Sequence, residues 1–277
     1  MEQSFPPRIH VLLARSSDLG LVLRRGPSKS VCTLLWNRRR DTFELGQWLR
    51  GRIYERRCDL SPDGSHFIYF AMNGRWISET GGSWTAISRA PYLRALVLLG
   101  KGDCWHGGGL FTGPRSYWLN EGYGHKSLRA SSEVTRDRSF VPTQNFGGEC
   151  PGVYYPRLLR DGWTLVERTG DARDACTVFE KPLRAGWVLR KLAHEQVDAA
   201  PGRGCYWDEH ELEHAASGLL DAYPDWEWAE RDAGSLVFAK AGALHRVRLP
   251  DGDGIGEPSL LRDFSDLRFK PIKAPYG

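Results

Sequence analysis

Residues 60–79 read LSPDGSHFIYFAMNGRWISE and combine two turn signals with one apolar run. Asp63-Gly64, preceded by Ser61-Pro62, has the composition of a tight hairpin turn, because glycine adopts a positive φ without steric cost. Phe67-Ile68-Tyr69-Phe70 follows that turn, and Gly74 marks a second one. Aromatic and β-branched residues bounded by turn residues are typical of a strand. The stretch therefore predicts a short buried strand between two turns.

The same pair of turns returns three more times along the chain. The first turns of the four units contain Gly64, Gly113, Gly162 and Gly234. The second turns contain Gly74, Gly122, Gly170 and Gly242. An apolar segment separates the two turns in each unit, and the third unit is predicted to be a strand hairpin over residues 153–166. Repeated meanders of short strands predict an all-β repeat protein.

The SPDG-containing unit resembles a blade of the TolB/WD40-like β-propellers. This resemblance covers residues 60–79 most strongly and implies the fold, but it transfers no functional residue. It implies a single β-propeller domain over residues 1–277, with about five blades of short antiparallel meanders. Closure of a propeller commonly uses strands from both termini in one blade. We therefore expect a C-terminal strand within residues 266–272 beside the N-terminal strands.

Composition agrees with a rigid β protein that has a substantial core. The 277 residues are 41% hydrophobic, with 11 Trp but only 2 Met, and the 31 Gly and 16 Pro suit many turns. No apolar run approaches the roughly 20 residues of a membrane span, and the N-terminus lacks the pattern of a signal peptide. The six cysteines occur singly, so we expect reduced thiols in a cytoplasmic protein without a membrane partner.

Charge is distributed unevenly along the chain. The net charge is +4, with the basic excess in residues 1–140 and an acidic excess after them. The candidate basic surface consists of five arginines: Arg38, Arg39, Arg40, Arg52 and Arg56. Such a surface could attract an acidic partner or nucleic acid, although arginines in a polar turn are often merely solvated.

Two short motifs point to catalysis but lack the context that catalysis needs. His210, Glu211 and His214 match HExxH, a zinc motif that requires a helix to bring both imidazoles to one face. The segment could equally be a strand, and charged neighbours crowd it, so we expect no metal. His106-Gly107-Gly108-Gly109 is similar to the oxyanion loop of lipases, but no G-x-S-x-G elbow accompanies it. A serine hydrolase is therefore excluded, and we expect no cofactor.

Alignment of the four units on their hairpin glycines yields a row of candidate binding residues. Seven positions before these glycines stand Arg57, His106, Tyr155 and Glu227. The neighbouring row is rich in Trp and suits packing between blades. Because side chains alternate along a strand, the polar row would then line the mouth of the central funnel. Its alternative role is ordinary channel lining that is hydrated by water.

These observations favour a non-catalytic binding or scaffold module for a protein partner, as a component of a bacterial complex. The first alternative is a small-ligand-binding or glycosidase-like propeller that uses the central funnel. A glycosidase needs two carboxylates, and the aligned inner positions offer only Asp59 and Glu227. The second alternative is nucleic-acid binding through the basic N-terminal half, which salt-sensitive affinity would reveal.

Overall fold

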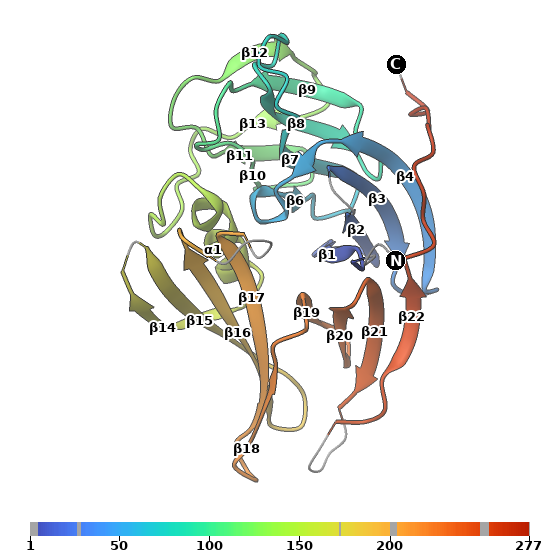
Figure 1. Cartoon of the computed structure of the whole chain (residues 1–277), viewed down its shortest axis with the longest axis vertical. Helices are drawn as coiled ribbons and strands as arrows, with labels where there is room; N and C mark the ends of the chain where they lie inside the picture. The colour runs from blue at the N-terminus through green and yellow to red at the C-terminus, as the bar shows by residue number, and fades with distance from the viewer. Residues whose placement is uncertain (1–4, 27–28, 172, 200–203, 250–254, 277) are drawn as a thin grey trace. The chain divides into compact units, whose positions relative to one another are not determined.

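Strands dominate the structure, a computed structural model that describes residues 5–26, 29–171, 173–199, 204–249 and 255–276. Within these residues the only α-helix is α1 (Cys150–Arg160). The prediction of an all-β fold with several antiparallel sheets is confirmed. The chain divides into two compact units (Figure 1): unit 1 comprises Met1–Phe5, His10–Arg157 and Leu267–Gly277, and unit 2 comprises Pro6–Ile9 and Leu158–Asp266.

Unit 1 holds three sheets. The first has the order β1 (Arg8–Leu13), β2 (Leu19–Arg25), β3 (Ser30–Asn37), β4 (Thr42–Arg50). The second has the order β12 (Lys126–Arg129), β9 (Ala95–Gly100), β8 (Ser83–Arg89), β7 (His66–Met72), β5 (Arg52–Ile53), and β6 (Asp59–Leu60) also pairs with β7. The third consists of β10 (Gly109–Phe111), β11 (Ser116–Leu119) and β13 (Thr135–Arg136), with β11 and β13 parallel.

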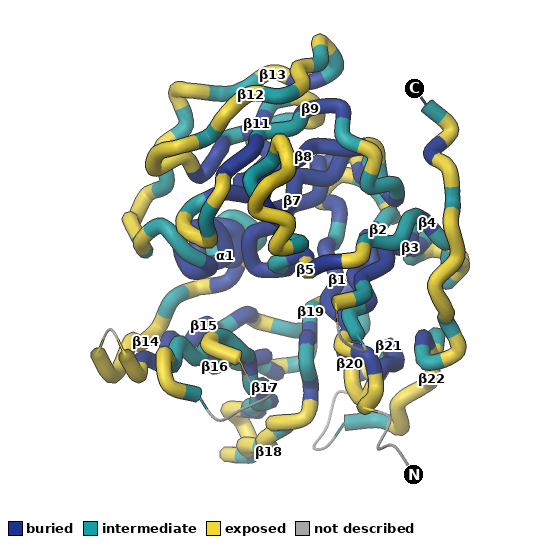
Figure 2. Tube along the Cα trace, turned by 45° about the horizontal axis from the view of Figure 1, so that its top comes forward, coloured by how far each residue is buried: buried dark blue, intermediate teal, exposed yellow. Residues whose placement is uncertain are grey.

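The core of unit 1 lies on both faces of β7. Phe67 and Tyr69 belong to one buried cluster with Leu21 of β2, whereas Ile68 belongs to another with Phe111 of β10. Alternate side chains of a strand point to opposite faces, so a strand between two layers needs a continuous apolar run. The run at residues 67–71 meets that need, and Figure 2 shows β7 and β8 buried.

Unit 2 holds two antiparallel sheets. The first has the order β14 (Thr164–Gly170), β15 (Asp174–Pro182), β16 (Trp187–Gln196), β17 (Tyr206–His214), β18 (Leu219–Tyr223). The second has the order β19 (Trp228–Asp232), β20 (Ser235–Lys240), β21 (Ala243–Arg248), β22 (Ser259–Asp263). Each strand follows its neighbour in sequence, as expected for meanders joined by short turns.

Three of the four predicted first hairpins are confirmed. Gly64, with φ of 80°, lies between β6 and β7, Gly113 lies between β10 and β11, and Gly234 lies between β19 and β20. The predicted second turns at Gly170 and Gly242 also connect paired strands. Local turn chemistry was therefore sufficient to locate most of these hairpins.

The predicted strand hairpin over residues 153–166 is wrong, because its first half is helix α1. Pro151 stands in the first turn of the helix, where its missing N–H costs no hydrogen bond. Every residue from Cys150 to Leu158 is buried, so this helix is enclosed on all sides and its sequence shows no single apolar stripe. Gly162, with φ of 86°, follows the helix as its C-terminal cap, since the Trp163 amide donates to the Leu158 carbonyl.

The predicted C-terminal strand within residues 266–272 is also wrong. The last strand of the described chain is β22, which pairs with β21, and the sheet that holds β1–β4 contains no C-terminal strand among the described residues. Figure 1 shows the following segment running beside β4. Pro271 and Pro275 explain its irregular course, because proline has no N–H to donate to a strand ladder.

Two further observations concern the whole described chain. All six cysteines are described and all are free thiols. Its helical residues form no segment with the length and apolar character that crossing a membrane requires.

Candidate functional site

The aligned row predicted to line a funnel lies on no strand. Arg57 belongs to the 3-10 helix η1 (Glu55–Arg57), and Tyr155 belongs to α1. His106 occupies a loop with φ of 58°, and Glu227 precedes β19, where it accepts a 2.7 Å hydrogen bond from the Ile9 amide. The alternation of side chains along a strand therefore does not apply to this row.

Two members of that row, Arg57 and His106, do come together in unit 1. The Arg57 side chain is 2% exposed, and its Nη1 donates to the Cys104 carbonyl at 2.6 Å and to the His106 carbonyl at 2.7 Å. Its Nη2 lies 3.6 Å from Glu149 Oε2, and the guanidinium lies over the Phe70 ring. Arg57 thus fastens a loop to η1, and its donors face the protein rather than solvent.

The five arginines of the predicted basic surface have different environments. Arg39 and Arg40 are exposed, whereas Arg38 is half-buried and donates to two main-chain carbonyls. Arg52 is exposed over the Tyr54 ring. Arg56 is 9% exposed, so it is a buried residue and not part of the surface. Only some of the predicted charge is therefore available to a partner.

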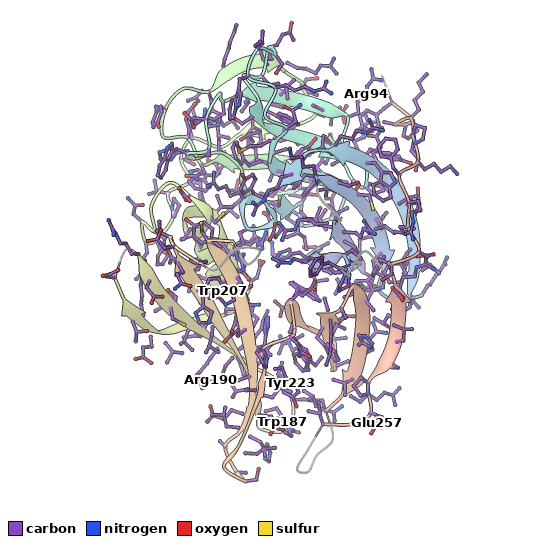
Figure 3. The ribbon with its side chains drawn as sticks, viewed as in Figure 1. Arg94, Trp187, Arg190, Trp207, Tyr223 and Glu257 are labelled. Atoms are coloured by element: carbon purple, nitrogen blue, oxygen red, sulfur yellow. The ribbon has the colours of Figure 1, made fainter. Side chains whose placement is uncertain are left out.

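The HExxH segment is strand β17, which removes the geometry that a zinc site needs. Four residues along a strand separate two Cα atoms by roughly 13 Å, whereas a zinc ion binds its ligands at about 2 Å. Glu211 points to the opposite face from His210, where its Oε2 accepts a 2.6 Å hydrogen bond from Arg190. Figure 3 shows Arg190 on this sheet. No cluster of three metal-ligating side chains occurs among the residues described.

Both ring nitrogens of each histidine in that motif already have partners. Lys191 Nζ lies 2.7 Å from His210 Nε2, and His210 Nδ1 lies 3.0 Å from the Trp226 carbonyl. A lysine ammonium can only donate, so Nε2 accepts and Nδ1–H donates to the carbonyl. His214 likewise contacts Ser217 Oγ and the Ala185 carbonyl. These histidines link strands and turns of unit 2.

A groove in unit 1 is the strongest candidate site, and the sequence did not indicate it. Four separate segments line it: β4, the chain from Leu93 through β9, the end of β12, and the segment that follows β22. Its volume is about 540 Å³, and it is lined by Gln47, Trp48, Leu49, Leu93, Arg94, Ala95, Leu98, Arg129, Lys273 and Ala274. An adjoining hollow shares Arg94, Lys273 and Ala274 and extends to Tyr276. We call the whole depression the C-terminal groove.

The C-terminal groove combines cations with an apolar floor. Arg94, Arg129 and Lys273 are exposed, and within the described parts of the chain none of them forms an ion pair with a carboxylate. Arg129 donates to the Ala95 carbonyl at 3.0 Å. The described residues of the lining include no Asp or Glu. By contrast, Arg89 on β8 pairs with Glu133 at 2.7 Å. The groove therefore offers positive charge that no carboxylate of the described residues pairs with.

Gln47 holds the walls of this groove together. Its Oε1 accepts from the amides of Leu93 and Arg94 at 2.8 and 2.9 Å, and its Nε2 donates to the Ile272 carbonyl at 2.7 Å. The preceding Gly46 permits this approach, because a Cβ there would overlap the Pro91 carbonyl. One amide side chain thus joins β4, the β8–β9 connection and the C-terminal segment.

Tyr276 attaches the C-terminal segment at a second point. Its hydroxyl donates to the Arg94 carbonyl at 2.8 Å and accepts from the Arg89 amide at 3.2 Å. Burial raises the pKa of Tyr276, so the phenol stays neutral and keeps the proton that it donates. Lys273 lies between the attachment points at residues 272 and 276. The backbone that carries Lys273 is therefore held at the groove by contacts on either side.

Acid should destabilise the protein partly through His125. Burial and the nearby Lys101 lower the pKa of His125 from 6.5 to about 4. Above pH 6.5 the histidine is neutral in both states, but as the pH falls toward 4 only the unfolded chain takes up the proton, which favours unfolding. We expect the urea midpoint of the wild type to fall more between pH 7 and 4.5 than that of His125→Gln. Equal decreases in the urea midpoint of the wild type and of His125→Gln would contradict this role of His125.

Comparison with known proteins adds no relative from which a role could be transferred. No protein family matches the chain, and no curated protein sequence matches it. The interpretation of the C-terminal groove therefore depends on its own residues and contacts.

Proposed function

We propose that this protein is a non-catalytic binding module for a protein partner, and that the C-terminal groove is where the partner docks. The observation that carries this proposal is a set of three exposed cations above an apolar floor, none of which forms an ion pair with a carboxylate of the described residues. Exposed charge without a counter-ion raises the local concentration of an oppositely charged partner. An apolar floor supplies the area that water leaves on binding.

A propeller is the scaffold we propose for this function. The described residues form five sheets of mostly antiparallel short strands, which supports about five blades, and the SPDG hairpin between β6 and β7 supports the resemblance to TolB/WD40-like repeats. Propellers provide rigid surfaces that hold binding residues in place. The fold permits many functions, so the site and not the fold carries the proposal. Cytoplasmic location and membership of a bacterial complex belong to the same proposal.

The polar groups that first pointed to enzymes support this view by their contacts. His210 and His214 are engaged at both ring nitrogens, and Asp59 Oδ2 accepts the Phe111 amide at 2.7 Å. Arg57 is likewise committed to main-chain carbonyls. Groups held in this way stabilise the fold and are poorly placed to meet a substrate.

Affinity purification from the organism that encodes the protein tests the proposal. The tagged wild type should retain a stoichiometric protein partner after nuclease treatment, and the double variant Arg94→Gln/Lys273→Gln should lose it. The matched control is Arg39→Gln/Arg40→Gln, which removes the same charge from two exposed residues outside the groove lining and should retain the partner.

Two other results would contradict the proposal. A nucleic acid that co-purifies and disappears with nuclease would favour the nucleic-acid alternative, whose affinity falls steeply with salt. A protein recovered alone from the wild type would leave the groove without a partner and direct attention to small ligands.

A further inference from the structure

We propose that the ligand of the C-terminal groove is an extended acidic peptide segment in which carboxylates alternate with apolar side chains. This inference rests on the proposed function and adds the chemical class of the partner.

The cations determine the charge of the ligand. Arg94 and Lys273 line both the groove and the adjoining hollow, and Arg129 lines the groove. A guanidinium presents donors in a planar fork that matches a carboxylate, and an ammonium donates from a single point. The Gln47 amide is occupied at both ends by the protein. The free groups are therefore mainly donors, and a ligand must bring acceptors that carry negative charge.

The apolar floor of the groove determines that the ligand also carries apolar side chains. Leu49, Leu98 and the half-buried Trp48 present apolar surface to the groove, and Phe269 lies 5.9 Å from Trp48 between ring centroids. Phe269 is 47% exposed, although the Arg50 guanidinium lies over its ring. The Arg24 guanidinium lies over the Trp48 ring. A simple inorganic anion would leave the floor in water. A ligand that also buries apolar side chains would use both parts of the site.

The form of the site favours an extended chain. The groove and the adjoining hollow follow the C-terminal segment from Lys273 to Tyr276, and Figure 3 shows Arg94 on the side of unit 1 along which that segment runs. In an extended peptide successive side chains point in opposite directions. Alternating residues can therefore direct apolar groups to the floor and carboxylates to the exposed cations.

Single-stranded nucleic acid fits the same surface less well. Protein sites that bind single-stranded nucleic acid without sequence preference stack successive bases on several aromatic side chains along a positively charged groove. Among the described residues, the aromatic side chains that line the groove and the adjoining hollow are Trp48 and Tyr276. The Trp48 ring already faces Phe269, and the Tyr276 hydroxyl is held by the main chain. The remaining floor is aliphatic. This chemistry matches leucine-like side chains better than stacked bases.

Fluorescence anisotropy with purified full-length protein and synthetic peptides tests this inference. The probe is a fluorescein-labelled peptide of alternating glutamate and leucine residues. We expect saturable binding that weakens with added salt. Arg94→Gln/Lys273→Gln should weaken it by about 100-fold, because each charged hydrogen-bonding group contributes roughly tenfold. Arg39→Gln/Arg40→Gln should change it by less than about twofold.

Changes in the peptide test the contributions of the cations and of the apolar floor one at a time, with the protein unchanged. Replacing every glutamate of the peptide by glutamine should abolish binding, and replacing every leucine by serine should weaken it at least about tenfold. Equal losses in the groove variant and the control variant would overturn the inference. So would an RNA oligonucleotide that competes as well as the peptide at equal ionic strength.

This experiment and partner purification can fail independently. If a groove-dependent partner is captured but no acidic peptide binds, the proposed function stands and the ligand class is wrong. If the peptide binds in a groove-dependent manner but no partner is captured, the ligand chemistry stands and the proposed function is wrong.

Discussion

Replacing Arg157 by methionine should lower the free energy of unfolding by about 3–5 kcal/mol. The Arg157 side chain lies on α1, is 5% exposed, and donates to the main-chain carbonyls of Glu55 and Cys58. Its Nη2 also lies 3.1 Å from His10 Nε2. Methionine fills much of the same volume but donates no hydrogen bond. Two buried carbonyls would then lack their donor, and η1 would lose its attachment to α1.

Urea denaturation followed by tryptophan fluorescence measures this effect. Arg157→Lys should lie between the wild type and the methionine variant, because an ammonium cannot reproduce the geometry of a guanidinium fork. Arg168→Met is the control, since Arg168 is exposed on β14 and its pair with Glu195 at 3.3 Å is a surface contact. It should cost less than about 1 kcal/mol. A loss below about 1 kcal/mol for Arg157→Met would show that the carbonyls find another donor.

The second large effect is expected at Gly108, where alanine should cost about 3 kcal/mol or more. Gly108 has φ of 73°, a conformation that costs an L residue about 1–2 kcal/mol. An added Cβ would also overlap the carbonyl of Arg57 and lie 2.8 Å from its Cβ. Such overpacking adds about 1–3 kcal/mol. The loop at residues 106–109 would have to move away from η1.

Gly102→Ala provides a matched control for that substitution. Gly102 has φ of 80°, but an added Cβ would meet nothing within 4 Å. Gly102→Ala should therefore lower the free energy of unfolding by about 1–2 kcal/mol, which is the contribution of the backbone conformation alone. The difference between the two variants isolates the close approach of the loop to Arg57. Equal losses would mean that the backbone conformation alone explains the glycine. The His-Gly-Gly-Gly run thus has a packing explanation in place of an oxyanion role.

The fold class and most hairpins could be predicted because their causes are local. The turn at Gly64 and the strand that follows it depend on a few neighbouring residues, and the same holds for the hairpin at Gly234. The helix at Cys150–Arg160 was missed for a related reason. The helix is buried on all sides from Cys150 to Leu158, so no periodic apolar stripe marks it, and aromatic residues beside a glycine turn also match the strand repeat.

The binding site could not be predicted because no local pattern encodes it. The HExxH motif has the right letters, but β17 places them along an extended chain, and the polar row at Arg57 becomes part of a helical turn and its loops. A motif of side chains performs its chemistry only in the backbone geometry that brings them together. Conversely, Arg94 and Lys273 show no motif in sequence.

The sequence by itself determined that this protein is built from short antiparallel strands, because turn residues and apolar runs act on their immediate neighbours. Only the tertiary structure decided which charged side chains bond to groups inside the protein and which are exposed to a partner. Arg57 and Arg157 are buried against carbonyls, whereas Arg94 and Lys273 are exposed beside an apolar floor and have no carboxylate partner in the described part of the chain. The Gln47 side chain donates a hydrogen bond to the Ile272 carbonyl, although 225 positions separate the two residues in sequence. Such contacts follow from how the sheets pack, and residue type alone does not specify them.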